Sequence, residues 1–240
     1  MKAVVCMTSW PPRIDYVPAA VRALLGQTRR PDAIYLTLSA CEFPGFSLTA
    51  ELRELADAGD IRILWTMENA RAFKKVFPVL PFLGDDDLIL TCDEDIIAPP
   101  DLLDSRLADF ERNLGTAPIT SVNRRSWYDT TVVGVTSLFQ KKMLRDWTRW
   151  VDGRVVATGN DDRTYLWAMY LNGYRAAFCS HLAIDGPVAS GEYLKPLDLP
   201  AGSTAYRSHL IGADYDRVVV PVIEGMTGRP IVKSFNYFGQ

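Results

Sequence analysis

The residues best suited to chemistry are Asp93 and Asp95, which flank Glu94 in the sequence. Two carboxylates at positions i and i+2, on a turn that leaves a strand, can face one hard cation. Mg²⁺ and Mn²⁺ prefer such oxygen ligands and share them with phosphate oxygens. The spacing therefore indicates a divalent-metal site that a phosphate group would share.

The Asp-x-Asp pattern occurs three times, so its context has to distinguish the copies. It recurs at residues 85–87, before an apolar strand, where a solvated turn is expected. It recurs again at residues 214–216, which we predict to lie in a loop. The copy at 93–95 directly follows an apolar strand and precedes the apolar residues 96–97. Because charges between apolar neighbours are costly without a metal or a partner, this copy is the favoured metal site.

Strands and helices alternate through the first 92 residues. The expected strands are residues 3–7, 33–38, 61–65 and 88–92, and the expected helices are 17–25, 48–59 and 73–80, the last weakened by Pro78. This alternation predicts a parallel sheet covered on both faces. In such sheets ligands bind beyond the carboxyl ends of the strands. Here those ends lead into residues 8–13, 39–42, 66–69 and 93–95.

The second half is less regular. We expect helices at residues 102–114, 143–151 and 162–172, strands at 131–139 and 176–179, and no clear periodicity from residue 180 onward. No repeat or linker separates the halves, and a chain of 240 residues that is 48% hydrophobic suffices for one core. We therefore predict a single α/β domain over residues 1–240.

Composition excludes several classes of protein. The net charge is -3 with no long run of either sign, so no nucleic-acid partner is expected. The apolar stretches are too short to span a bilayer, and the run at residues 3–7 is typical of a strand rather than a signal peptide. The four cysteines are scattered, which favours reduced thiols in a cytoplasmic protein.

Several motifs resemble one family. Residues 85–96, reading DDDLILTCDEDI, are similar to the strand and D-x-D segment of bacterial GT-A glycosyltransferases. Residues 8–14 (TSWPPRI) and 24–32 (LLGQTRRPD) resemble the opening of the same proteins, where a nucleotide-contacting loop precedes an "xQTxxPD" helix exit. Residues 73–78 (FKKVFP) resemble the lysine-proline helix of a bacterial subgroup that makes surface polysaccharides.

A further match lies downstream. Residues 160–162 (NDD), with Leu166 and residues 172–174 (NGY), look like the "ED…L…GY" segment of inverting family 2-like enzymes, although Asp161 stands where Glu is common. The matches together cover roughly residues 3–180. They imply a GT-A fold, which is Rossmann-like with a mostly parallel central sheet and helices on both faces. Residues 1–98 would bind the nucleotide sugar and residues 99–240 the acceptor.

The resemblance also implies an activity. A hexosyltransferase of this kind moves sugar from a UDP- or GDP-sugar to a glycan or lipid-linked acceptor, here in bacterial surface polysaccharide synthesis. Mn²⁺ or Mg²⁺ would neutralise the diphosphate leaving group. Asp95 would be the more direct metal ligand, with Asp93 toward the metal and the donor ribose. A lipid-linked acceptor would imply peripheral membrane contact.

An inverting enzyme also needs a base for the acceptor hydroxyl. Asp162 is our candidate, with Asp161 beside it, because the N-terminus of a helix stabilises a charged carboxylate there. The alternative for this pair is an ordinary helix N-cap.

Other assignments follow from the same resemblance. Thr8 and Arg13 would contact the nucleobase or ribose, unless they are turn-forming residues. Lys74 or Lys75 would approach the diphosphate, unless both lie on a solvated helix face.

The histidines and aromatic residues have plainer alternatives. His181 or His209 could complete the metal shell, although a structural or surface role is favoured. Aromatic residues that could stack on a sugar, but that fill cores more often, are Trp127, Tyr128, Trp147, Trp150 and Trp167.

Rival functions differ after the first strand. A nucleotidyltransferase would have a glycine-rich basic loop there, whereas residues 8–13 contain no glycine. A HAD-type phosphatase would place Asp-x-Asp there, and a dinucleotide-binding oxidoreductase would need G-x-G-x-x-G. A non-catalytic glycan-binding α/β domain stays open, because a metal site can bind without catalysing.

Overall fold

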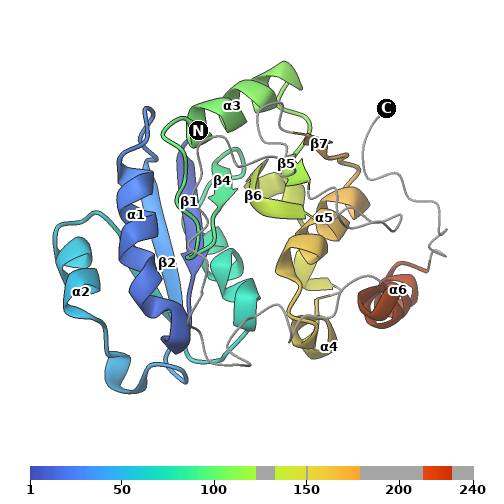
Figure 1. Cartoon of the computed structure of the whole chain (residues 1–240). Coiled ribbons are helices and arrows are strands. Elements are labelled where there is room, and N and C mark those ends of the chain that lie inside the picture. The colour runs from blue at the N-terminus through green and yellow to red at the C-terminus, as the bar shows by residue number, and fades with distance from the viewer. Residues whose placement is uncertain (123–132, 150, 179–212, 229–240) are drawn as a thin grey trace.

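The computed structural model describes residues 1–122, 133–149, 151–178 and 213–228 (Figure 1). Within these residues a seven-stranded sheet has the order β3-β2-β1-β4-β6-β5-β7. The strands are β1 (Ala3–Thr8), β2 (Ala33–Ser39), β3 (Arg62–Thr66), β4 (Leu88–Thr91), β5 (Ile119–Val122), β6 (Val133–Gln140) and β7 (Ala177–Phe178). The first four are parallel, and β6 runs antiparallel to both β4 and β5. The expected mostly parallel sheet is therefore confirmed.

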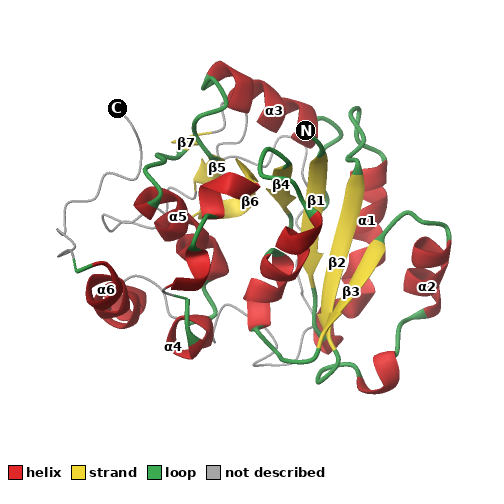
Figure 2. Cartoon of the chain, turned by 180° about the vertical axis from the view of Figure 1, so that it is seen from behind, coloured by secondary structure: helices red, strands yellow, loops and turns green. Residues whose placement is uncertain are grey.

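Helices cover both faces of this sheet. The α-helices are α1 (Val17–Leu25), α2 (Ala50–Asp57), α3 (Leu102–Arg112), α4 (Gly153–Ala157), α5 (Asp161–Leu171) and α6 (Ala213–Thr227). The 3-10 helices are η1 (Pro11–Tyr16), η2 (Pro44–Phe46), η3 (Arg71–Lys75), η4 (Phe77–Phe82), η5 (Lys141–Leu144) and η6 (Trp147–Arg149). Figures 1 and 2 show α1 and α2 on one face of the sheet, with the short helices of residues 71–82 on the other.

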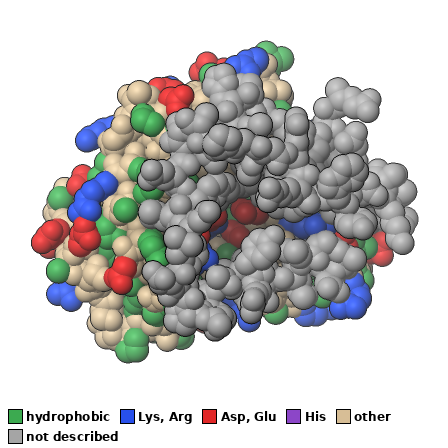
Figure 3. All heavy atoms as spheres, in the orientation of Figure 1, with side chains coloured by type: hydrophobic (Ala, Val, Ile, Leu, Met, Phe, Trp, Pro, Cys, Tyr) green, Lys and Arg blue, Asp and Glu red, His purple; other side chains and the backbone are tan. Residues whose placement is uncertain are grey.

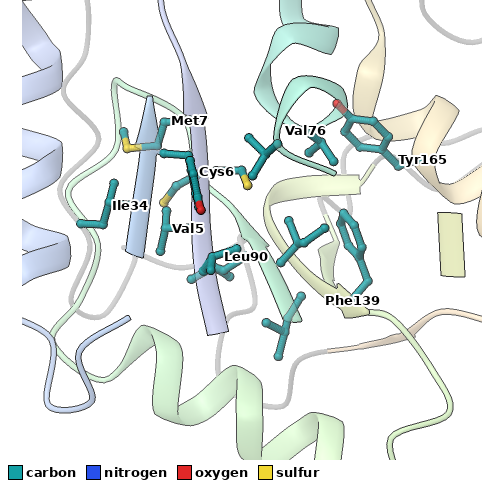
Figure 4. Close-up of a cluster of buried hydrophobic side chains, with 14 of the residues drawn as sticks. Val5, Cys6, Met7, Ile34, Val76, Leu90, Phe139 and Tyr165 are labelled. Atoms are coloured by element: carbon teal, nitrogen blue, oxygen red, sulfur yellow. The ribbon is translucent and has the colours of Figure 1, made fainter. Parts of the chain in front are cut away.

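The core lies on both faces of the central strands. Every residue of β1 and of β4 is buried, as expected for parallel strands between two helical layers. Figure 4 shows side chains of β1, β4 and β6 meeting Val76 and Tyr165. The Tyr165 ring packs edge-on against Phe73 and Phe77, with centroids 6.3 and 5.5 Å apart. These contacts hold the start of α5 beside η3, which brings the two halves of the chain together.

Two expected helices are wrong in kind. The helix predicted over residues 73–80 is instead two 3-10 helices, because Pro78 and Pro81 have no N–H to donate. The helix predicted over 143–151 is also two short 3-10 turns, η5 and η6. Between them Asp146 has φ +58°, a left-handed conformation that breaks a helix.

The loop predicted for residues 214–216 is also wrong, because they lie in α6. Val219, Val222 and Ile223 of this helix are buried, and their i, i+3, i+4 spacing is a helical signal that the sequence analysis missed. The carboxylate of Asp216 accepts a hydrogen bond from Arg163 Nη2 at 2.9 Å, so it serves to dock α6 on α5.

The remaining expectations agree with the structure at the level of elements. The strand predicted at 131–139 is β6, with residues 131–132 outside the described part, and the strand at 176–179 is the shorter β7. Cys6, Cys41 and Cys92 are free thiols, while Cys179 lies outside the described residues. Among the helices that the structure describes, none is both long and apolar enough to cross a membrane.

Candidate active site

The four loops predicted to share one edge of the sheet are joined in two pairs. Ala40 N donates to Thr66 O at 2.8 Å, and Asn69 Nδ2 donates to Glu42 Oε1 at 2.8 Å, which joins the loops after β2 and β3. Arg13 Nη1 donates to Asp95 Oδ2 at 2.9 Å, which joins the loops after β1 and β4. These contacts are possible because β1 to β4 are parallel, so their carboxyl ends lie at the same edge of the sheet.

Arg13 holds the loop of residues 93–95, which we call the acidic loop. Pro11 and Pro12 start η1, which carries the guanidinium group back over the end of β4. Besides its bond to Asp95, Arg13 Nη1 lies 3.4 Å from Glu94 Oε1, and the arginine side chain is 11% exposed. Its Nε is buried without a hydrogen-bond partner in the structure. Contact between Arg13 and a nucleotide stays a prediction.

Lys74 and Lys75 are both buried, at 1% and 4% exposure, so the alternative of a solvated helix face is wrong. The Lys74 ammonium pairs with Glu42, which Asn69 also holds. The Lys75 ammonium donates to Asp93 Oδ1 at 2.6 Å and lies 3.5 Å from Asp161 Oδ2. Adjacent lysines therefore bind carboxylates in different places.

The N-cap alternative for Asp161 and Asp162 is also wrong. The cap of α5 is Asn160, whose Oδ1 accepts a hydrogen bond from Arg163 N at 3.2 Å. Asp161 is 4% exposed, and its Oδ2 has no hydrogen-bond partner in the structure. Asp162 lines a small, largely apolar pocket. The other residues that line this pocket are Pro118, Ser137, Phe139, Tyr165, Leu166 and Met169.

These groups form an acidic cluster, by which we mean Asp93, Glu94, Asp95, Asp161 and Asp162 with the cations Arg13 and Lys75. Its five carboxylates outnumber its two cations. Figure 3 shows acidic and basic side chains together in the middle of one face of the molecule. The cluster therefore has an excess of negative charge close to the carboxyl edge of the sheet.

The excess changes proton affinities in the acidic loop. Burial, with the charges of Asp93 and Asp95, raises the pKa of Glu94 to about 7. Burial and Asp93 also raise the pKa of Asp95, against the opposing effect of Arg13. Any positive charge added near such a group would stabilise its carboxylate form.

On α5 the direction is the reverse of our expectation for Asp162. Burial and the charge of Asp161 raise its pKa well above the ordinary value, and they outweigh the opposing charge of Lys75. Burial by itself would lower the pKa of Lys75, but Asp161 and Asp93 raise it well above its usual range. The lysine is therefore a permanent cation.

The donor set fits a divalent metal in charge and in atom type, since carboxylate oxygens are hard ligands and negative charge is in excess. Within the described residues, however, no three side chains of His, Cys, Asp or Glu are grouped as a metal shell. Asp93 and Asp95 are instead ion-paired with Lys75 and Arg13. His181 and His209 lie outside the described residues. The metal stays a prediction.

The remaining candidate residues that the structure describes make contacts within the protein. Thr8 Oγ1 donates to Thr37 O at 2.7 Å and thereby ties β1 to β2. Trp147 stacks on Phe77, and Trp167 is 2% exposed, which supports a packing role for both. Trp127, Tyr128 and Trp150 lie outside the described residues.

Two features of the site were missed. The pairing of Glu42 with Lys74 was not foreseen, although lysines inside the apolar run of residues 73–80 signal buried cations that need partners. Asn160 was not recognised as the cap of α5, although asparagine before a helix start is a preferred N-cap.

Several solved structures with a similar fold are glycosyltransferases. S. aureus TarS 1-349 matches in its UDP-GlcNAc complex with TM-score 0.57 and 12% identity, over 96% of this chain and 74% of that chain. The UDP complex of TarS 1-349 matches with TM-score 0.55 and 13% identity, over 76% of this chain and 59% of that chain. The mannosyltransferase PcManGT from Pyrobaculum calidifontis, in complex with GDP-Man and Mn²⁺, matches with TM-score 0.55 and 16% identity, over 74% and 54%.

The chain thus spans between about half and three quarters of these glycosyltransferase structures. A 4-diphosphocytidyl-2C-methyl-D-erythritol synthase matches with TM-score 0.49 and 13% identity, over 78% of this chain and 95% of that chain. No protein-family model and no curated protein matches the sequence. The fold predicted for this chain, that of the GT-A glycosyltransferases, is confirmed.

Proposed function

We propose that this chain is a metal-dependent, inverting glycosyltransferase that transfers a sugar from a UDP- or GDP-sugar to a glycan or lipid-linked acceptor. The observation that carries the proposal is the convergence of two acidic segments. Residues 93–95 and 161–162 come from different halves of the chain and meet across Lys75 at the ligand-binding edge of a GT-A sheet. Donor and acceptor would have to meet at such an edge.

In this proposal Asp93 and Asp95 hold a divalent cation, which neutralises the diphosphate as it leaves. Arg13 orients the Asp95 carboxylate, and Lys75 holds that of Asp93 until the cation binds. The support for this role is the excess of carboxylates over cations in the acidic cluster, because a divalent cation would remove much of it.

Asp162 takes the proton of the acceptor hydroxyl. Its raised pKa supports this role, because it makes the ionised carboxylate a stronger proton acceptor. Because the carboxylate must be ionised before it accepts a proton, the transfer rate should rise with pH through the raised pKa of Asp162. The pocket that it lines is bounded mostly by apolar side chains of β6 and α5, among them Phe139, Leu166 and Met169.

The acceptor assignment extends to surface polysaccharide synthesis. It rests on the resemblance of residues 73–78 to the lysine-proline helix of a bacterial subgroup that makes surface polysaccharides.

A ligand screen tests the proposal. Melting temperatures are measured with UDP- and GDP-sugars, with and without Mn²⁺, because a ligand that binds the native state raises stability by mass action. We expect one nucleotide sugar to stabilise the chain more with Mn²⁺ than without, and NMR of the product to show inversion. Stabilisation by a nucleoside triphosphate with release of pyrophosphate would identify a nucleotidyltransferase. Stabilisation by glycans alone would identify a binding domain.

A further inference from the structure

Lys75 links three elements. Its own helix η3 follows β3, Asp93 follows β4, and Asp161 lies in the first turn of α5. An ammonium group this deeply buried is stable only where carboxylates surround it. Lys75 is therefore placed where the metal-binding edge and the helix of Asp162 meet.

The two contacts of Lys75 are unequal. Its bond to Asp93 Oδ1 is short, at 2.6 Å, whereas Asp161 Oδ2 is 3.5 Å away and accepts no hydrogen bond. A buried carboxylate oxygen without a hydrogen-bond donor costs folding free energy. Movement of the Lys75 ammonium toward Asp161 would remove this cost. The shift needed to close a hydrogen bond is less than about 1 Å. The geometry thus offers Lys75 a second position.

A cation at Asp93 would drive this shift. A divalent ion on that carboxylate repels the ammonium and competes for the same oxygen, while it leaves the attraction of Asp161 in place. We propose that Lys75 is a positioning residue which moves from Asp93 toward Asp161 when a divalent cation binds, and so fixes the first turn of α5 with Asp162. This inference rests on the proposed metal role of Asp93 and Asp95.

Mn²⁺ alone, without nucleotide sugar, is the probe. Its affinity is measured by calorimetry, and hydrogen exchange of the α5 amides at residues 163–166 is measured with and without the ion. In the wild type we expect Mn²⁺ to slow this exchange roughly fivefold or more, a usual size for coupling between two sites. In Lys75→Met we expect Mn²⁺ to bind about tenfold tighter, because its competitor is gone. The α5 amides should then no longer respond.

Two further variants separate positioning from mere packing. Lys75→Arg keeps the charge and should restore the slowed exchange. Lys74→Met removes the neighbouring buried lysine, which contacts Glu42, and should leave the α5 response to Mn²⁺ in place even where stability falls.

The outcomes are distinct. If the wild type binds no Mn²⁺, the proposed metal site fails and the inference fails with it. If Mn²⁺ binds but leaves α5 exchange unchanged in the wild type, the inference alone is overturned, whether or not Lys75→Met folds. An unchanged α5 response in Lys75→Met would overturn it as well, since the ion would then act on Asp161 directly.

Discussion

Lys74 and Lys75 are neighbours in η3, and both ammonium groups are buried, yet they meet different surroundings. Lys74 faces the Glu42 carboxylate, which Asn69 also holds, so one cation meets one anion. Lys75 lies in the acidic cluster, where five carboxylates share two cations. Similar burial thus accompanies a balanced pair in one place and an excess of negative charge in the other.

The difference separates a structural ion pair from the proposed binding site. A balanced buried pair satisfies both partners and leaves no demand for a ligand. Surplus carboxylates lower stability and raise one another's pKa, and such perturbed groups gather where a ligand or a reaction needs them. We therefore expect the same change of carboxylate to amide to act differently in the two places.

The largest effect is expected for Asp162→Asn. The amide cannot accept the acceptor proton, so transfer should fall by about 10²–10⁴-fold, the usual contribution of a general base. Donor binding should stay within a few-fold of wild type, because Asp162 is not one of the proposed metal ligands. Single-turnover transfer and calorimetry with the donor measure the two effects.

Transfer by Asp162→Asn within a few-fold of wild type would show that another group is the base. In the wild type the transfer rate should also rise with pH, because a raised pKa keeps Asp162 protonated at lower pH. A retained anomeric configuration in the product would remove the need for this base.

The next effect contrasts Glu42→Gln with Asp93→Asn. Glu42→Gln leaves the Lys74 ammonium buried without its carboxylate and should cost about 3–5 kcal/mol of unfolding free energy. Asp93→Asn should cost less, because the Asp161 carboxylate still lies 3.5 Å from the Lys75 ammonium. Urea unfolding in EDTA compares the two variants. Equal losses would mean that the acidic cluster has no surplus charge.

Glu94→Gln should give a smaller effect that depends on pH. Since the pKa of Glu94 rises from 4.5 to about 7 on folding, its ionised form is penalised in the native state. The penalty is fully present above pH 7 and absent below pH 4.5. The variant should therefore be more stable than wild type at pH 8, by up to about 3 kcal/mol, and equal to it at pH 4.

These stabilities are measured without divalent ions. A gain for Glu94→Gln that is the same at pH 4 and pH 8 would contradict the raised pKa of Glu94.

Much of the first half of the fold could be predicted from the sequence. Apolar strands alternating with helices predict that β1 to β4 are parallel, and parallel strands place the loops at 8–13 and 93–95 at one edge of the sheet. The antiparallel pairing of β6 with β4 could not be predicted, because the apolar pattern of residues 131–139 does not show which strand it pairs with or in which direction.

The site was predicted in residue type more than in detail. Asp93, Asp95 and Asp161 do lie in one cluster, but their partners Arg13 and Lys75 come from elements distant in sequence. The direction of the Asp162 pKa was expected wrongly, because a helix N-terminus is visible in sequence whereas burial and a neighbouring charge arise from packing.

The central claim is a divalent cation held at residues 93–95 for a nucleotide sugar. Calorimetry of nucleotide-sugar binding with and without Mn²⁺, in wild type and Asp95→Ala, tests it most directly. We predict that Mn²⁺ tightens binding in the wild type and has no effect in the variant. Binding by Asp95→Ala that Mn²⁺ enhances as strongly as in the wild type would contradict the account.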